Sequence, residues 1–377
     1  MGSIRRVVHG SGQQAWQARW RDPAGIQRSK NFRRRIDAER HLTAVESEIL
    51  AGRYVDSALG KIRFDEWLPQ AEAARINRRP STKARDESYY RNLIVPTFGT
   101  MPLCSIQPVH VQRWVADLAE KEYAAATIRK AYQLLSRTLD AAVQSGVILR
   151  TPCRGVQLPT NDTAEMRFLS PAEIQQLADA INPRFLALVL TGAYTGARFG
   201  ELAALRVDDF DRDADQIQIV RTLSEVNGHL HFGEPKTRAA RRRVTLPSWL
   251  TRSLEQHLED WRSPGEALVF TSPGGGALRR SFRRRYWKPA VRHSVGEPMR
   301  FHDLRHSHVA LLIEQGTHPA VIAARLGHAS VKTVLDVYGH LYEGLDRQAA
   351  GGLEAPWSTS LHRPHPRQER KDFGMER

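Results

Sequence analysis

The first sixty residues alternate apolar and polar positions in a way that predicts a small sheet followed by a helix. Residues 15–20 alternate with the period of two that is typical of a strand. The turn-forming residues 23–25 follow, and residues 26–32 can return as the partner strand. Between 36 and 50 the apolar residues recur at helical spacing. Residues 1–57 are therefore expected to form a small sheet-plus-helix domain.

Residues 62–150 contain only helical patterns. Apolar residues recur there three or four positions apart in four successive segments, which is the spacing of amphipathic helices. The segments are the stretch that holds Phe64, Trp67 and Leu68, and residues 81–90, 109–121 and 127–145. Gly146 ends the last of them. The pattern predicts a compact bundle of four short helices.

A linker and a larger domain are expected after the bundle. Residues 151–166 hold scattered proline and glycine without periodicity, which is typical of a linker. At Ser170 the sequence Ser-Pro-Ala-Glu forms a capping box with proline at the first helical position. Residues 167–350 are expected to form this domain, and the polar residues 351–377 a flexible tail.

The patterns within the larger domain are mainly helical. Helical spacing extends to about residue 205 and resumes from about 281 to 345. Three strand-like runs lie between these stretches, at 216–222, 229–232 and 242–246. The chain is therefore expected to be mainly α with small β-sheets. This α+β fold comprises a small sheet-plus-helix domain, a helical domain and a mixed, mostly helical domain.

The charge of the chain indicates an anionic partner. Lysine and arginine number 56 against 41 aspartate and glutamate, which gives a net charge of +15. Nucleic acid is the commonest partner of such a chain, although a solvated basic surface has the same composition. Positive charge gathers in residues 1–40 and 279–288, where it is expected to face phosphates. A solvated helix face is the alternative at 279–288.

Other classes of function lack their sequence signals. Cys104 and Cys153, the two cysteines, form no disulfide framework or zinc motif and fit a reducing cytoplasm. The longest apolar run, 185–190, is too short to span a membrane, so a cytoplasmic protein without a membrane partner is expected. The acidic run 208–215 lacks the glycine and glutamate of a calcium loop. The Walker A and HExxH patterns are absent, and the histidine pairs lack a third ligand, so neither cofactor nor metal is expected.

The remaining candidates for chemistry begin with two arginines and a histidine. Arg198 follows a glycine at a helix start, and Glu201 lies one turn later, where it can orient the arginine. His302 and Arg305 stand three residues apart, so that their side chains share a helix face. Taken alone, each of these pairs is also compatible with an ordinary structural ion pair or helix cap.

A lysine, a second histidine and two tyrosines complete the set. Lys236 lies between two strand-like runs, where a lysine is normally just solvated. His328 follows a glycine that ends a helix, and Tyr338 comes ten residues later. Taken alone, this tyrosine is compatible with a half-buried core residue. Tyr342, one helical turn further on, is the competing nucleophile.

In order and spacing, these residues resemble the active-site pattern of the tyrosine recombinases, the phage integrase family. The strings TGARFGELAAL, FHDLRHSHVALLIEQG and LGHASVKTVLDVYGH look like the sequence boxes of that family. The resemblance covers residues 165–345. Residues 62–150 resemble the core-binding (SAM-like) domain, and residues 1–57 the arm-site-binding domain of phage-type integrases. Ala197 stands where the family usually has a larger aliphatic residue, which alters only packing. The catalytic residues that the resemblance implies are Arg198, Lys236, His302, Arg305, His328 and Tyr338.

The resemblance implies a site-specific DNA recombinase that integrates or excises a phage or mobile element. Tyr338, rather than Tyr342, is the nucleophile and forms a 3′-phosphotyrosine intermediate, so that neither ATP nor a metal is needed. The two arginines hold the non-bridging oxygens of the phosphate, and His328 adds a further donor. His302 acts as the base, and Lys236 as the general acid for the 5′-oxygen.

The implied partners are double-stranded DNA at attachment sites, further copies of the chain in a homo-tetramer on DNA, and excision or host accessory DNA-bending proteins. Three alternatives remain open at this point. They are a host-type chromosome-dimer resolvase of the same family, a type IB-like topoisomerase, and a non-enzymatic DNA-binding regulator on a recombinase fold. The basic residues 1–57 favour the phage or mobile-element type.

Overall fold

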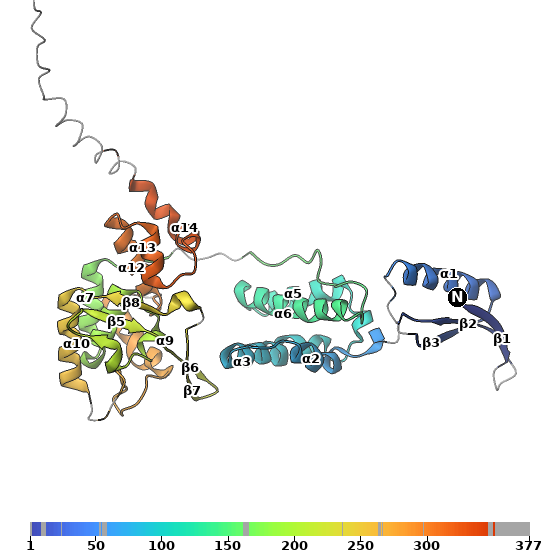
Figure 1. Cartoon of the computed structure of the whole chain (residues 1–377), viewed down its shortest axis with the longest axis horizontal. Coiled ribbons are helices and arrows are strands. Elements are labelled where there is room, and N and C mark those ends of the chain that lie inside the picture. Colours follow the sequence, from blue (N-terminus) through green and yellow to red (C-terminus); the bar gives the residue numbers. More distant parts are fainter. Residues whose placement is uncertain are drawn as a thin grey trace, which may run out of the picture. The chain divides into compact units, whose positions relative to one another are not determined.

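The structure is a computed structural model that describes residues 2–8, 13–23, 25–52, 54, 59–160, 166–235, 237–262, 265, 267–296, 298–345 and 350. The chain forms two compact units, residues 1–163 and 164–377, whose elements are drawn in Figure 1. No helix in the described ranges has the length and apolar character that crossing a membrane requires.

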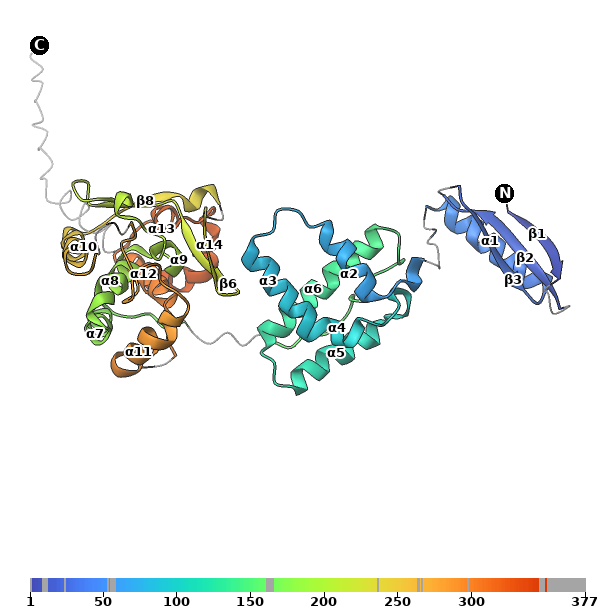
Figure 2. The same cartoon turned by 90° about the horizontal axis from the view of Figure 1, so that it is seen from below.

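A three-stranded antiparallel sheet and one helix open the first unit. The elements are β1 (Ser3–Val8), β2 (Gln14–Arg21), β3 (Gln27–Phe32) and α1 (Arg35–Leu50). The helix α1 lies along one face of the sheet (Figure 2). Ala18 and Trp20 of β2 form a buried cluster there with Ala38 and Leu42 of α1. The predicted strand pair and helix are confirmed. The pattern does not predict β1, because the apolar and polar residues of this edge strand do not alternate; Ile4 and Val7 are only half-buried and Val8 is exposed.

The helical part of the first unit contains each of the four predicted helices. The elements are α2 (Phe64–Ala73), α3 (Pro80–Tyr89), α4 (Val95–Phe98), α5 (Pro108–Glu120) and α6 (Ala125–Gln144). A π-helical turn, Tyr90–Ile94, carries α3 into α4 beyond its expected end. The widened turn accommodates Pro96, which has no N–H to donate to a regular helix. The core of this bundle includes Phe64, Trp67 and Phe98, all fully or almost fully buried.

Residues 151–160 of the expected linker lie against this bundle. Cys153 is buried in its core, and the backbone N–H of Gln157 donates to the Gln112 side chain at 2.8 Å. Arg129 donates to the carbonyl of Pro159 at 2.9 Å. These three contacts involve residues at irregular spacing, so the sequence shows no periodic pattern that would predict them. Residues 161–165, the remaining part before Met166, lie outside the described residues.

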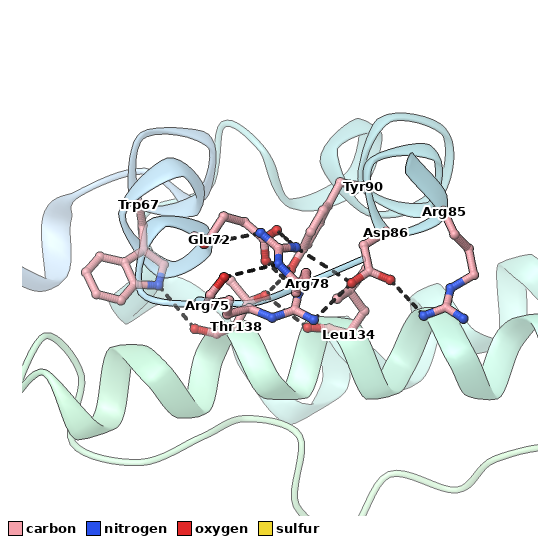
Figure 3. Close-up of polar contacts among 9 residues, drawn as sticks. All are labelled: Trp67, Glu72, Arg75, Arg78, Arg85, Asp86, Tyr90, Leu134 and Thr138. Carbon is pink, nitrogen blue, oxygen red and sulfur yellow. Dashed lines mark hydrogen bonds and ion pairs between the residues drawn. The ribbon is translucent and has the colours of Figure 1, made fainter. Parts of the chain in front are cut away.

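A network of half-buried charges around the buried Asp86 joins α2, α3 and α6 (Figure 3). Arg75 donates to Glu72 at 2.8 Å and to Asp86 at 2.9 Å, and Arg78 pairs with the same two carboxylates. The Tyr90 hydroxyl contacts Glu72 at 3.1 Å and, on α6, the hydroxyl of Thr138 at 2.7 Å. Asp86 is 3% exposed, so removal of its charge would leave Arg75 and Arg78 to share the single carboxylate of Glu72 in a poorly hydrated site.

The second unit packs helices around two small antiparallel sheets (Figure 1). The helices are α7 (Pro171–Ala180), α8 (Leu186–Thr195), α9 (Phe199–Leu202), α10 (Ser248–Trp261), α11 (Lys288–Ser294), α12 (Asp303–Glu314), α13 (Pro319–Leu326) and α14 (Lys332–Tyr338). The strands are β4 (Phe210–Asp211), β5 (Gln216–Ile219), β6 (Thr222–Val226), β7 (His229–Gly233) and β8 (Arg242–Thr245). The capping box at Ser170 is confirmed, with Glu173 N–H donating to the serine hydroxyl at 3.3 Å.

Two expectations for this unit need correction. The run 216–222 is not one strand. The strand β5 ends at Ile219, and after Arg221 the chain enters β6, which belongs to the other sheet. At this interruption the side chain of Arg221 forms an ion pair with the buried carboxylate of Asp209. Helix α10 was not expected, although Leu250, Leu254 and Leu258 repeat at helical spacing and are buried. The spacing of these leucines is itself a helical signal in the sequence.

The charge network of the helical bundle generates a stability prediction. The substitution Asp86→Asn should lower the free energy of opening of α2, α3 and α6 by about 3 kcal/mol, because it leaves Arg75 and Arg78 with one carboxylate. Hydrogen–deuterium exchange of peptides from these helices in the full-length protein measures the change. The control is Asp117→Asn, which breaks an exposed pair with Arg113 and should leave the exchange of these helices close to that of the wild type. Equal effects of the two variants would contradict a structural role for the network.

Candidate active site

A glycine turn at the end of α8 places Arg198. Gly196 adopts the left-handed conformation, with φ of 65°, and Ala197 behind it is buried. A Cβ atom on Gly196 would lie 2.6 Å from Leu326 and 2.8 Å from the ring of His308, so only glycine fits. The turn reverses the chain at once into α9, whose N-cap residue is Arg198.

Glu201 holds two arginines in position. Its carboxylate accepts a hydrogen bond from Arg198 Nη1 at 2.9 Å and from Arg242 Nη2 at 2.9 Å. The predicted orientation of Arg198 by Glu201 is thereby confirmed. Glu201 is 4% exposed; burial raises its pKa, but the charges of Arg242 and Arg198 outweigh burial and lower the pKa below its usual value. Glu201 is therefore ionised, and it is shared between two cations.

Arg305 bridges the C-terminal ends of two helices. Its guanidinium is 3% exposed and donates to the carbonyl of Gly196, after α8, at 2.7 Å. It also donates to the carbonyl of Leu326, at the end of α13, at 2.9 Å. Helix C-termini carry unpaired carbonyl groups and partial negative charge, which suit a buried cation. Burial and the charges of Arg198 and Arg242 lower the pKa of Arg305 to about 9, so it stays protonated at neutral pH.

His328 is bonded directly to Arg305. Arg305 Nη2 donates to His328 Nε2 at 2.8 Å, and because arginine has no acceptor, this histidine carries its proton on Nδ1. The Nδ1–H group is buried and has no hydrogen-bond partner among the described residues. Burial and the surrounding arginines, Arg305 first, lower the pKa of His328 to about 4, so the ring is neutral.

His302 caps α12 beside this cluster. Its pKa is lowered to about 4, first by partial removal from water and then by electrostatic interaction with the neighbouring His306, Arg305 and Arg198. The ring packs edge-on against His306, with centroids 5.1 Å apart. His302 is therefore neutral at pH 7 and stands next to the two arginines.

Tyr338 ends α14 and is 3% exposed. Its hydroxyl lies 2.6 Å from Nδ1 of His306, a residue that the sequence patterns did not single out for this role. Burial raises the pKa of Tyr338 to about 12, although the charge of Arg305 acts in the opposite direction. The competing Tyr342 is half-buried, and its hydroxyl has no hydrogen-bond partner within the described part of the chain.

The structure thus brings together five of the six expected residues: Arg198, His302, Arg305, His328 and Tyr338. The sixth, Lys236, lies outside the described residues. Arg242, Arg325 and His306 belong to the same cluster but were missed, because their partners lie 17 to 131 residues away in the sequence. The cluster 279–288 is largely exposed, and Arg279 donates to the carbonyl of Gly228 at 3.0 Å, which ties it to the β6–β7 hairpin.

Comparison with known proteins identifies the family. Residues 167–344 match the model of the phage integrase family, and residues 63–119 match that of the phage integrase N-terminal SAM-like domain. The prophage phiRv2 integrase of Mycobacterium tuberculosis is 31% identical over 369 residues, which cover 93% of this chain and 94% of that protein.

Solved structures show the same fold. The Tn1549 transposon integrase, in complex with circular intermediate DNA, aligns with a TM-score of 0.68 at 20% identity, over 78% of this chain and 100% of that one. A lambda integrase dimer bound to a core site aligns with a TM-score of 0.58 at 17% identity, over 97% of both chains. This chain belongs to the phage integrase family and is a tyrosine-type site-specific DNA recombinase of the phage and mobile-element kind.

Proposed function

We propose that the chain cuts and rejoins double-stranded DNA at the attachment sites of a phage or mobile element, through a 3′-phosphotyrosine on Tyr338. The observation that carries this proposal is an excess of positive charge around the buried side chains of Arg242 and Arg305. Arg198, Arg242 and Arg305 lie within electrostatic range of one another, with Glu201 as the carboxylate among them. Such a cluster is completed by an anion, and a phosphodiester gains further negative charge as it is attacked.

The donors of the cluster suit the phosphate of that reaction. Three of the five N–H groups of Arg305 donate to Gly196, Leu326 and His328, which leaves two for a phosphate oxygen. Arg198 is held by Glu201 and keeps a side chain that is 42% exposed, so it can reach a bound strand. The Nδ1–H of His328 supplies a neutral donor. We assign the non-bridging oxygens to these three residues.

Proton transfer completes the proposed reaction. His302 is neutral at pH 7, which is the state that a base for the hydroxyl proton of Tyr338 requires. Lys236 follows β7 in sequence, and we propose it as the general acid that protonates the departing 5′-oxygen. The phosphotyrosine bond conserves the energy of the broken phosphodiester, so rejoining is the reverse reaction and needs no nucleotide cofactor.

The assembly proposed here follows from the reaction. Strand exchange joins two duplex sites, each with two strands to cut, which requires four active sites and hence a homo-tetramer on DNA. The lambda integrase, a neighbour in fold, has been solved as a tetramer bound to a Holliday junction. We propose that residues 1–57 bind arm-type sites, that residues 62–150 and 167–350 bind the core site, and that accessory DNA-bending proteins set the direction.

The nucleophile assignment predicts the behaviour of Tyr338→Phe. Wild-type protein is mixed with sheared DNA from the genome that encodes it, and DNA that stays attached after denaturation is sequenced. A nicked duplex with the recovered site, called the captured duplex below, then serves as substrate. Tyr338→Phe should bind it with unchanged affinity and form no adduct on a denaturing gel. Tyr342→Phe is the matched control and should still form the adduct. An adduct that persists with Tyr338→Phe, or none with the wild type, would contradict the proposal.

The bidentate role of Arg198 predicts a second result. Lysine keeps the charge of arginine but lacks its planar fork. Arg198→Lys should therefore slow adduct formation on the captured duplex by about 100-fold, the usual effect of losing one preorganised donor. The measurement is the single-turnover rate, and the control is Arg113→Lys in the exposed pair of α5. A rate within a few-fold of wild type would show that charge alone suffices.

The general-acid role of Lys236 predicts rescue by a better leaving group. A sulfur in place of the 5′-bridging oxygen needs no proton to depart, because a thiol has a pKa near 8.5. Lys236→Ala should be slow, by about 10²-fold or more, on the oxygen substrate and close to wild type on the sulfur one. Arg198→Lys should stay slow on both. Equal slowing of Lys236→Ala on the two substrates would rule out the acid role.

A further inference from the structure

The hydroxyl of Tyr338 contacts a histidine other than the one expected to act as base. Nδ1 of His306 lies 2.6 Å from this hydroxyl, and the two ring centroids are 5.7 Å apart at an interplanar angle of 52°. His302 contacts the ring of His306 instead, one helical turn away. Within the described site, His306 is therefore interposed between the expected base and the nucleophile.

The placement of His306 follows from its position next to Arg305. Consecutive residues of a helix point about 100° apart, so α12 directs the two side chains to different neighbours. Arg305 reaches the ends of α8 and α13 and the ring of His328. His306 reaches the end of α14, where Tyr338 is packed among the buried side chains of α12 and α13. One helix therefore fixes both the cation at the phosphate and the phenol that attacks it.

The surroundings of His306 keep it neutral. Four groups face it from the start of α12, namely Arg300, His302, Asp303 and Arg305, and Tyr338 faces it from α14. Burial lowers the pKa of His306, Asp303 acts against this effect, and Arg300 and Arg305 add to it. A neutral imidazole with its proton on Nε2 offers a lone pair on Nδ1 to the phenol O–H. The phenol, whose pKa burial raises, requires such an acceptor in order to attack.

We propose that His306 is the base that takes the proton of Tyr338 during strand cleavage. This inference rests on the proposed function and reassigns to His306 the base role that was expected of His302. The O–H bond of Tyr338 breaks, and its proton moves to Nδ1 of His306 while the phenol oxygen bonds to phosphorus. The bond from phosphorus to the 5′-oxygen breaks, and that oxygen takes a proton from Lys236. Rejoining reverses each transfer, so that no net proton is consumed.

Two substitutions separate proton transfer from mere positioning. His306→Asn puts an amide oxygen near the place of Nδ1, where it can accept the hydrogen bond but cannot hold the proton at neutral pH. His306→Gln extends its amide toward the place of Nε2 and loses the contact. The matched control is His293→Asn, because His293 is exposed and its Nδ1 bonds to the carbonyl of Pro289, away from the site.

The experiment measures single-turnover adduct formation by the full-length variants on the captured duplex, with oxygen or sulfur at the 5′-bridge. His306→Asn and His306→Gln should both be slower than wild type by about 10²-fold or more. They should be equally slow on the sulfur substrate, because the defect lies with the nucleophile. DNA affinity should be unchanged, and His293→Asn should match the wild type.

Other outcomes would overturn the assignment in distinct ways. A rate near wild type for His306→Asn, with a slow His306→Gln, would reduce His306 to a positioning residue. A large loss in His302→Asn together with a normal His306→Asn would return the base role to His302. Failure of the wild type to form a Tyr338 adduct would instead refute the proposed function itself.

A second measurement does not depend on a folded variant at position 306 or on DNA. Nitrogen-15 NMR of the wild-type protein reports which ring nitrogen of His306 carries the proton. The proposal requires the Nε2–H form at neutral pH, and it requires the Nδ1 resonance to shift in Tyr338→Phe. A proton on Nδ1, or a resonance that does not respond to Tyr338→Phe, would overturn it.

Discussion

A single buried guanidinium, that of Arg305, is the interaction on which the geometry of the catalytic unit depends. It joins the carbonyl groups that end α8 and α13 and holds the ring of His328. Both helices end on glycines in the left-handed conformation, Gly196 and Gly327, with φ of 65° and 70°. These turns leave the terminal carbonyls unpaired within their own helices and available to Arg305. Segments more than 100 residues apart in sequence are thereby fixed around one cation.

The same arrangement gathers several guanidinium groups around one carboxylate, Glu201, so their positive charges are not fully balanced. Arg242 donates to Glu201 and to the carbonyls of Ala240 and Arg325, and Arg325 donates to the carbonyls of Tyr194 and Thr245. Carbonyl groups satisfy the donors but carry no net charge, so repulsion among the guanidinium groups persists at low local dielectric. A phosphodiester relieves that repulsion. The site therefore favours its substrate most when the negative charge on the non-bridging oxygens is greatest, in the transition state, which is the requirement for catalysis.

Sequence patterns predicted most of what local interactions determine, helix α10 with its regularly spaced leucines being the exception, and they failed where long-range contacts decide. The helices of the bundle and the capping box at Ser170 follow from spacing and local hydrogen bonds. Strand β1 is stabilised by pairing at an edge, and the break at Arg221 by an ion pair with Asp209, so neither has a periodic signature. The order of arginine, histidine and tyrosine motifs indicated five residues that do assemble. The sequence carries no pattern that marks Arg242 and His306, because only the fold brings them to Glu201 and Tyr338.

The central claim is that this arginine cluster holds the phosphate that Tyr338 attacks. The most direct measurement is a structure of the Tyr338→Phe protein bound to the duplex that the wild type captures. The account predicts one phosphate within hydrogen-bond distance of Arg198, Arg305 and the Nδ1 of His328, with the ring at position 338 beneath it and next to His306. The account would be contradicted if the scissile phosphate lay away from these guanidinium groups. It would also be contradicted if the ring at position 338 lay next to a different phosphate.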